Sequence, residues 1–199
     1  MQDKPFAASI DSTSFVPSRY DKHIVRTLSS MHGQFFDTDA YEHALHEEDR
    51  ELYEVYFLER PNEIGEMACG TSILHPGKIG DEFCMTKGHF HSVMETAEVY
   101  YGLDGEGMLL METPEGEWAA EELRPGKIVY VPPRWAHRSV NTGDKDLVVF
   151  FVFPAHTGQN YGSIEEQGFR KLVLDRGGKA RIEDNPRWLP PEKRKRVEK

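Results

Sequence analysis

The feature that most constrains the fold is a long series of short apolar segments separated by turn sequences. From Tyr53 onward, segments rich in Val, Ile, Tyr and Phe alternate with links such as HPGKIGDE, DGEG, TPEGE and NTGDKD. Many short strands at a spacing of roughly 8 to 12 residues are typical of an all-β sandwich or barrel. The candidate strands are 53–59, 67–74, 83–91, 97–103, 107–112, 117–122, 127–131, 136–141 and 147–153.

Helical signals are confined to the region before these strands. The stretch DTDAYEHALHEED predicts a helix from Asp37 to about Glu48, because Asp37 or Thr38 can cap it and Tyr41 and Leu45 share one face. Near the other end, FRKLVLDRGGKARIED predicts a last strand pair around an Arg-Gly-Gly turn.

The length of the chain indicates one domain with appendages. A chain of 199 residues with 38% hydrophobic residues can bury one sizeable core. We expect an N-terminal extension over 1–50, with a helix near 37–48, that is part of the same domain. We further expect a β-barrel over 51–185 and a charged C-terminal tail over 186–199 that frays from residue 190 onward.

Charge and composition limit the partners. A formal net charge of −10 disfavours binding to nucleic acid, and the one basic cluster, KRKR at 193–196, is short. No apolar run of about 18 residues exists to span a membrane, and the N-terminus lacks the pattern of a secretory signal. The two cysteines, Cys69 and Cys84, form no C-x-x-C motif and are expected to be buried thiols. We therefore expect a cytoplasmic protein.

The stretch KGHFHSVMETAEVYYGLDGEG contains the first candidate site. On a strand, His89 and His91 lie on one face and Phe90 on the other, so the two imidazoles can reach a common point. This H-x-H pattern alone fits two exposed strand histidines equally well.

A second segment, PGKIVYVPPRWAHRSVN, changes this balance. Together the two segments resemble the paired motifs of the cupin superfamily, small β-barrels that hold a metal ion through three histidines and a carboxylate. The second motif fits at Gly126, Pro132, His137 and Asn141, and Arg134 occupies a position that is usually glycine. In the first motif, Phe83 occupies the leading glycine position and two glutamates compete for the role of ligand.

The two glutamates differ in how firmly the chain would hold them. Glu98 begins the segment EVYYGL, which leads into the hairpin turn DGEG, so ladder pairing would fix its side chain. Glu95 lies in the connection SVMETA, where nothing obvious holds it. We therefore favour Glu98 over Glu95.

The resemblance narrows to the cupin-type phosphoglucose isomerases. It is carried by TSILHPGKIGDEFCMTKGHFH, AEVYYGLDGEGMLLMETPEGE, PGKIVYVPPRWAHRSVNTGD, FPAHTGQNYGSIEEQGFRKLV and DNPRW, which run through most of the chain. The resemblance implies a cupin jelly-roll barrel with a few short peripheral helices, a homodimer, and metal-dependent interconversion of glucose 6-phosphate and fructose 6-phosphate in glycolysis and gluconeogenesis.

The same resemblance implies a set of site residues. The metal ligands would be His89, His91, Glu98 and His137; the catalytic residues would be Glu98 and Tyr100; and the substrate contacts would be Ser72, Thr86, Gly88, Tyr100 and Tyr161. The chain departs from the family pattern at Ser72 (threonine expected), Phe153 (tyrosine expected) and Gln159 (histidine expected). Thr86 and Gly88 point away from the histidines on an ideal strand, so a bulge or kink near Gly88 is required if Thr86 reaches the ligand.

The implied cofactor is one divalent metal ion per subunit, iron first, with manganese, nickel or zinc as alternatives. Either proton transfer by Glu98 or a metal-promoted hydride shift would complete the isomerisation. Three other functions fit the same motifs: an isomerase of mannose 6-phosphate, a cupin dioxygenase, and a non-catalytic cupin that binds metal and sugar.

Overall fold

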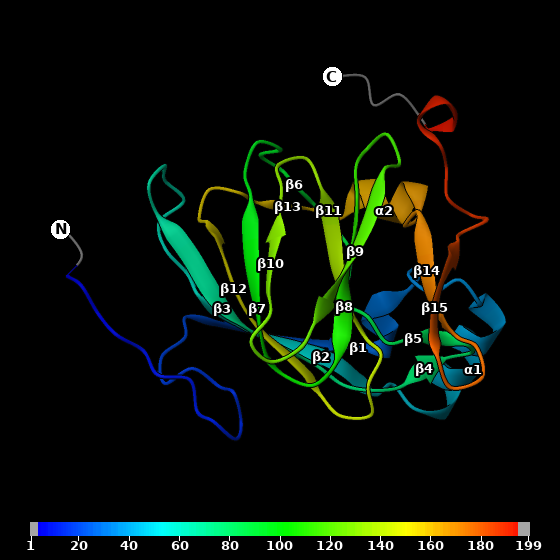
Figure 1. The fold of residues 1–199 in the computed structure, drawn as a ribbon, viewed down its shortest axis with the longest axis horizontal. Helices are drawn as coiled ribbons and strands as arrows, with labels where there is room; N and C mark the ends of the chain where they lie inside the picture. The colour runs from blue at the N-terminus through cyan, green and yellow to red at the C-terminus, as the bar shows by residue number, and fades with distance from the viewer. Residues whose placement is uncertain (1–3, 195–199) are drawn as a thin grey trace.

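Two antiparallel β-sheets face each other and make up most of the molecule (Figure 1). The computed structural model describes residues 4–194. The larger sheet has the strand order β1-β2-β3-β12-β7-β10, and the smaller sheet has the order β11-β8-β9. The strands of the larger sheet are β1 (Lys22–Thr27), β2 (Glu51–Leu58), β3 (Met67–Leu74), β7 (Glu98–Asp104), β10 (Ile128–Val131) and β12 (Leu147–Pro154). Those of the smaller sheet are β8 (Gly107–Glu112), β9 (Trp118–Leu123) and β11 (Ala136–Asn141).

Shorter elements lie beside these sheets. A further sheet has the order β15-β14-β5-β4, and β13 pairs with β6. The strands are β4 (Lys78–Ile79), β5 (Glu82–Phe83), β6 (Phe90–His91), β13 (Gln159–Asn160), β14 (Lys171–Asp175) and β15 (Ala180–Asp184). The α-helices are α1 (Thr38–Glu47) and α2 (Gly162–Gln167), and the 3-10 helices are η1 (Leu28–Met31) and η2 (Pro191–Lys193). The predicted all-β fold with short peripheral helices is confirmed.

Most candidate strands agree with the structure to within two residues at each end, but the candidate 83–91 is wrong. β5 ends at Phe83 and β6 begins only at Phe90. Between them the backbone makes only isolated bridges, Met85 with Val140 and His89 with His137. Both bridges join the segment to β11, so it runs beside that strand without forming a continuous ladder, whereas β5 pairs with β4 and β14, and β6 pairs with β13.

The N-terminal region contributes a strand that the sequence did not predict. The segment KHIVRT forms β1, which pairs antiparallel with β2 at the edge of the larger sheet. Ile24 and Arg26 point to the inside of the molecule, whereas Val25 between them is 42% exposed. Helix α1 follows as predicted, and the Asp37 side chain accepts a hydrogen bond from the Ala40 N–H at 2.9 Å.

The chain after β15 is held more firmly than expected. The prediction that the chain frays from residue 190 is wrong for 190–194, because Arg194 donates hydrogen bonds to the carbonyls of Leu189 and Pro114. The guanidinium groups of Arg170 and Arg194 lie 4.8 and 5.3 Å from the centre of the Trp188 ring. The remaining part of the predicted tail, 195–199, lies outside the described residues.

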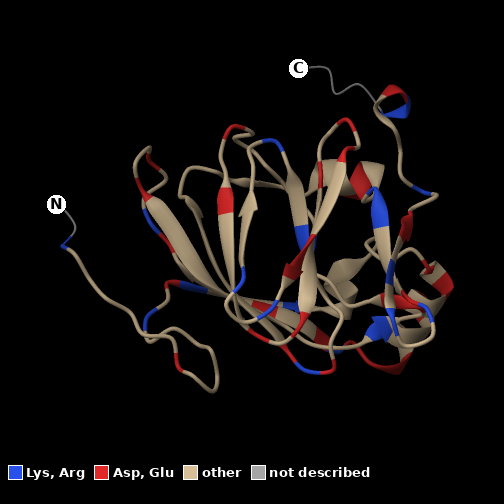
Figure 2. Cartoon of the chain, in the orientation of Figure 1, with Lys and Arg blue, Asp and Glu red and all other residues tan. Residues whose placement is uncertain are grey.

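Charged residues are distributed without a dominant basic face. Figure 2 shows Lys and Arg positions scattered among Asp and Glu positions over strands and loops. Within residues 4–194, no helix is long and apolar enough to cross a membrane.

Two carboxyl groups are buried where the smaller sheet meets the C-terminal strands. Glu82 is 3% exposed and accepts a hydrogen bond from the Phe36 N–H at 2.7 Å. Glu112 is fully buried and accepts hydrogen bonds from the Gln167 amide and the Arg170 N–H. Burial raises the pKa of each carboxyl to about 7, although these hydrogen bonds and the positive charge of Arg138 oppose the rise.

These two groups predict a pH dependence of stability. A carboxyl whose pKa is higher in the folded state favours folding when protonated, so its contribution is full below pH 4.5 and lost as the pH rises to 7. Glu82→Gln removes one such titration. Relative to wild type, this variant is expected to gain about 2 to 3 kcal/mol of unfolding free energy between pH 4.5 and pH 8. Urea unfolding at several pH values measures this gain.

Glu121→Gln, at an exposed position on β9, is the control. Equal pH slopes of the unfolding free energy for Glu82→Gln and wild type would contradict the prediction.

Candidate metal centre

Four side chains from separate parts of the chain converge between the two main sheets. His89 precedes β6, His91 ends β6, Glu98 begins β7, and His137 lies on β11. Backbone pairing brings His89 and His137 together. The His89 N–H donates to the His137 carbonyl, and the His137 N–H donates to the His89 carbonyl. Side chains of such directly opposed residues lie on the same face.

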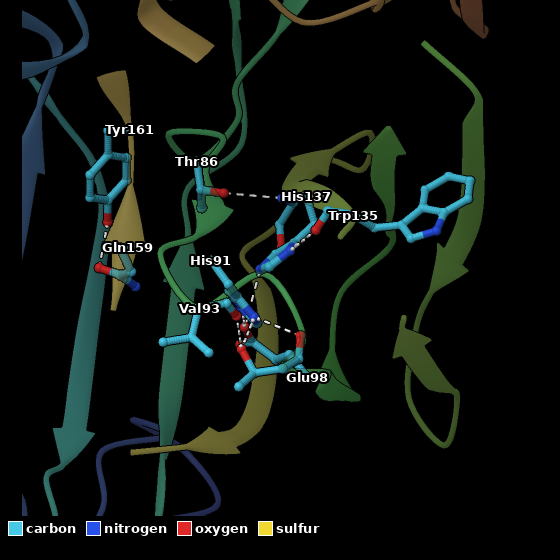
Figure 3. A network of polar contacts seen from close by, with 10 residues as sticks. Thr86, His91, Val93, Glu98, Trp135, His137, Gln159 and Tyr161 are labelled. Carbon is cyan, nitrogen blue, oxygen red and sulfur yellow. Dashed lines mark hydrogen bonds and ion pairs between the residues drawn. The ribbon is translucent and has the colours of Figure 1, made fainter. Parts of the chain in front are cut away.

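The ligand atoms of these four residues form a compact cluster. One nitrogen or oxygen from each of His89, His91, Glu98 and His137 lies within 4.8 Å of all the others. The Nε2 atoms of His91 and His137 are 3.0 and 3.1 Å from the same oxygen, Oε2 of Glu98 (Figure 3). All four side chains are buried, with at most 8% of any residue exposed.

The surroundings of His89 and Glu98 favour the protonation states in which these side chains can bind a cation. Burial, together with the neighbouring His137 and His91, lowers the pKa of His89 to about 3, so its imidazole is neutral. Burial alone would raise the pKa of Glu98, but the close contacts with His137, His91 and His89 outweigh it and lower the pKa to about 2. Neutral imidazoles and an ionised carboxylate are the ligand states of a metal site.

The hydrogen bonds of His91 test whether the cluster fits a metal ion. Nδ1 of His91 lies 3.0 Å from the backbone carbonyl of Thr96, which can only accept, so the proton is on Nδ1. Nε2 therefore presents a lone pair toward the Glu98 oxygen, which is itself an acceptor. Nε2 of His137 likewise faces this carboxylate oxygen, at 3.1 Å, and Nδ1 of His89 is buried without a hydrogen-bond partner among residues 4–194. Acceptors that face one another in a buried site are stabilised by a cation between them, so the residues fit a divalent metal ion.

Thr96 supports the site from outside the ligand set. Its hydroxyl oxygen is 2.9 Å from Nδ1 of His91 and donates to the Val93 carbonyl at 2.6 Å. The loop between the histidines and β7, which seemed unordered from sequence, thus fixes the tautomer and orientation of His91.

Replacing Thr96 by valine is therefore expected to weaken metal binding by about 10-fold, since one of the two acceptors for the His91 N–H is lost. Competition with a chromophoric chelator measures the affinity. Thr142→Val, on the loop after β11, should leave the affinity unchanged. Equal affinities for Thr96→Val and wild type would show that the hydroxyl has no such role.

The structure separates the two competing glutamates. Glu98 is 4% exposed within the cluster, whereas Glu95 is exposed on the loop. Arg134, at the position where the motif usually has glycine, adopts the left-handed backbone conformation with φ of 73°. The turn geometry is thus kept despite the substitution, and the Arg134 N–H donates to the Met94 carbonyl at 2.7 Å.

A cavity of about 560 Å³, including open solvent at its mouth, adjoins the cluster. Of the residues that the resemblance implied as substrate contacts, four line the cavity: Ser72, Thr86, Tyr100 and Tyr161. Thr86 accepts a hydrogen bond from the Ser139 N–H at 3.0 Å, and the Tyr161 hydroxyl donates to Gln159 at 2.8 Å (Figure 3). Phe153 and Gln159, which with Ser72 are the three departures from the family pattern, also lie on this wall.

Gly88 is placed differently from the other implied contacts. It is absent from the described cavity wall and packs instead beneath Phe169, where an added Cβ would lie 2.6 Å from the ring and 3.0 Å from Nε of Arg138. The irregular backbone between β5 and β6 lets Thr86 face the cavity, which is the departure from a straight strand that the sequence required.

Several residues that line the cavity were not predicted from the sequence. Arg26, Tyr53, Phe57 and Phe151 line the cavity from β1, β2 and β12. Lys87 also lines it and pairs with Glu165 at 3.2 Å. The alternation of apolar residues in these strands indicates an inner face, but only the sheet order shows which inner residues meet the histidines.

A two-sheet antiparallel fold that holds three histidines and a glutamate between its sheets defines a cupin with a candidate metal centre. The chain belongs to the glucose-6-phosphate isomerase family, because the family model described as "Glucose-6-phosphate isomerase (GPI)" matches residues 25–188.

Known glucose-6-phosphate isomerases are similar in sequence to this chain over nearly its whole length. A glucose-6-phosphate isomerase of Thermococcus gammatolerans is 49% identical over 186 residues, covering 93% of this chain and 97% of that protein. One of Thermococcus litoralis is 45% identical over 185 residues, again covering 93% and 97%. Among solved structures, an oxalate decarboxylase of Bacillus subtilis matches 53% of this chain and 26% of its own, with a TM-score of 0.44 and 24% identity.

Proposed function

We propose that this protein interconverts glucose 6-phosphate and fructose 6-phosphate at a single divalent metal ion held by His89, His91, Glu98 and His137. Two features support the proposal: a buried cluster of three imidazoles and one carboxylate, and an adjoining cavity lined by hydroxyl groups. Membership of the isomerase family supports the choice of reaction.

The chemical difficulty is the removal of a proton next to a sugar carbonyl, which is a weak acid. A divalent metal ion, when bound, would polarise the sugar oxygens at C1 and C2 and so stabilise the negative charge that develops there. Three neutral imidazoles add no charge and one carboxylate adds −1, so the centre keeps a net charge of about +1 toward the substrate.

Glu98 is the candidate base that carries the proton between C1 and C2. It lines the cavity, and the Oε2 oxygen is the one that both imidazoles approach, which leaves Oε1 for proton transfer. Tyr100, two residues along β7, points to the same side, and its ring lies 5.6 Å from that of His137. Burial and the Glu98 charge raise the pKa of Tyr100 well above its usual value, so it stays protonated and can donate a hydrogen bond to a sugar oxygen.

The remaining wall suits the polar body of the sugar. Ser72 contributes a buried hydroxyl that has no hydrogen-bond partner among the residues that the structure describes, and the Thr86 hydroxyl, which accepts from the Ser139 N–H, still has its proton to donate. Tyr161 packs over His89 with its ring 5.2 Å away, which limits water at the centre.

Three finer features complete the proposal. The native metal is iron, with manganese, nickel or zinc as substitutes, since nitrogen and carboxylate ligands suit all four. The protein is a homodimer, and the free, unpaired cysteines Cys69 and Cys84 support a reducing, cytoplasmic location.

A coupled assay tests the reaction. The protein, loaded in turn with each metal, is given fructose 6-phosphate, and glucose 6-phosphate formation is followed through a dehydrogenase. Metal-dependent turnover is expected. Preference for mannose 6-phosphate, or oxygen uptake with small diols, would replace the proposal by one of the other cupin functions, and binding without turnover would make the protein a non-catalytic cupin.

A further inference from the structure

The cavity wall carries few charged side chains, and one of them forms no ion pair with another described residue. Apart from neutral His89, the ionised residues that line the cavity are Arg26, Lys87 and Glu98. Glu98 faces the imidazoles, and Lys87 is paired with Glu165 at 3.2 Å. Within the described part of the chain, Arg26 makes no ion pair with a carboxylate.

Arg26 reaches the cavity because β1 is part of the larger sheet. It lies opposite Tyr53 in the register of β1 and β2, and the Tyr53 hydroxyl accepts a hydrogen bond from the Lys87 N–H at 3.3 Å. Burial raises the pKa values of Tyr53 and Tyr161, and the positive charge of Arg26 opposes both rises. Arg26 interacts with the Tyr53 phenol and lines the same cavity as Tyr161, whose ring lies 5.2 Å from that of His89.

Another polar group on the same inner face would serve a different part of a ligand. The Ser72 hydroxyl on β3 is buried without a hydrogen-bond partner in the described part of the chain, whereas Arg26 is half-buried on β1, two strands away. A ligand that satisfies both groups needs hydrogen-bonding atoms along its length and an anionic end.

We propose that Arg26 binds the phosphate of the sugar-phosphate substrate, an inference that rests on the proposed function. A phosphate dianion needs a cation at its binding site, and a guanidinium donates two parallel hydrogen bonds to phosphate oxygens. No carboxylate of residues 4–194 forms an ion pair with Arg26, whereas the ammonium of Lys87 is paired with Glu165. The N-terminal strand is thus a part of the substrate site and determines the preference for a phosphorylated sugar.

Binding of an analogue that cannot be isomerised tests this role without turnover. Glucitol 6-phosphate lacks the carbonyl group, and its affinity for the zinc-loaded protein can be measured by calorimetry. Arg26→Gln is expected to weaken its binding by about 10- to 100-fold, and Arg26→Lys by less, because a single charged donor remains. Lys22→Gln removes an exposed positive charge from the same strand and should leave the affinity unchanged.

Inorganic phosphate distinguishes the failure of this inference from the failure of the proposed function. If the wild type does not bind glucitol 6-phosphate, the proposed substrate is wrong, and the inference then stands only if inorganic phosphate binds the wild type at least 10-fold more tightly than Arg26→Gln. Equal affinities of wild type and Arg26→Gln for both probes would overturn the inference. A loss of zinc from Arg26→Gln, checked by metal analysis, would likewise assign Arg26 a structural role.

Discussion

Glu98→Gln is expected to lower the turnover of fructose 6-phosphate by about 1,000-fold or more and to reduce the bound metal in the same preparation. Two losses combine: the amide is no longer an ionised ligand facing His91 and His137, and it cannot accept a proton from the sugar. The coupled assay and metal analysis of the purified variant measure the two effects together.

Glu95→Gln is the matched control for this prediction, since it makes the same change three residues earlier at an exposed loop position. It should keep both activity and metal content close to those of wild type. Similar losses in the two variants would mean that the wrong carboxylate has been assigned.

Gly70→Ala is expected to lower the free energy of unfolding by about 3 kcal/mol or more. Gly70 lies within β3, where an added Cβ would lie 2.0 Å from the Tyr56 carbonyl oxygen of β2 and 2.8 Å from the Phe151 ring of β12. Neither neighbour can yield freely, because the first is backbone in a ladder and the second is 4% exposed.

Urea unfolding of Gly70→Ala measures this cost. Gly162→Ala, at the start of α2, is the control, since the nearest atom to its added Cβ is 3.8 Å away, and its unfolding free energy should stay within about 0.5 kcal/mol of wild type. If Gly70→Ala were as stable as this control, β2 and β3 would not approach as closely as described.

The sequence was most informative where a residue's role depends on its own strand. The alternation of His89, Phe90 and His91 predicts which side chains share a face, and the hairpin after EVYYGL correctly favours Glu98 as the carboxylate that meets the histidines. The capped helix at Asp37 is equally local. The partnership of these residues with His137, 46 positions beyond His91, came only from the resemblance to paired cupin motifs.

Features that depend on tertiary placement were not predictable. β1 was missed because KHIVRT is short and mostly polar, and only pairing with β2 makes it a strand. Thr96 lies in a loop without periodicity, so its contact with His91 has no sequence signal. The candidate strand 83–91 was wrong because the sequence does not reveal that β5 and β6, at the two ends of this segment, join different sheets.

The central claim, that one metal ion at the four-residue cluster carries the isomerisation, is tested most directly by titrating metal into chelated protein while following glucose 6-phosphate formation. Turnover should be absent without metal, rise in proportion to added metal, and stop rising at one equivalent per chain, with His137→Ala showing no such rise. Full turnover by the chelated protein, or a rise that His137→Ala shares, would contradict the account.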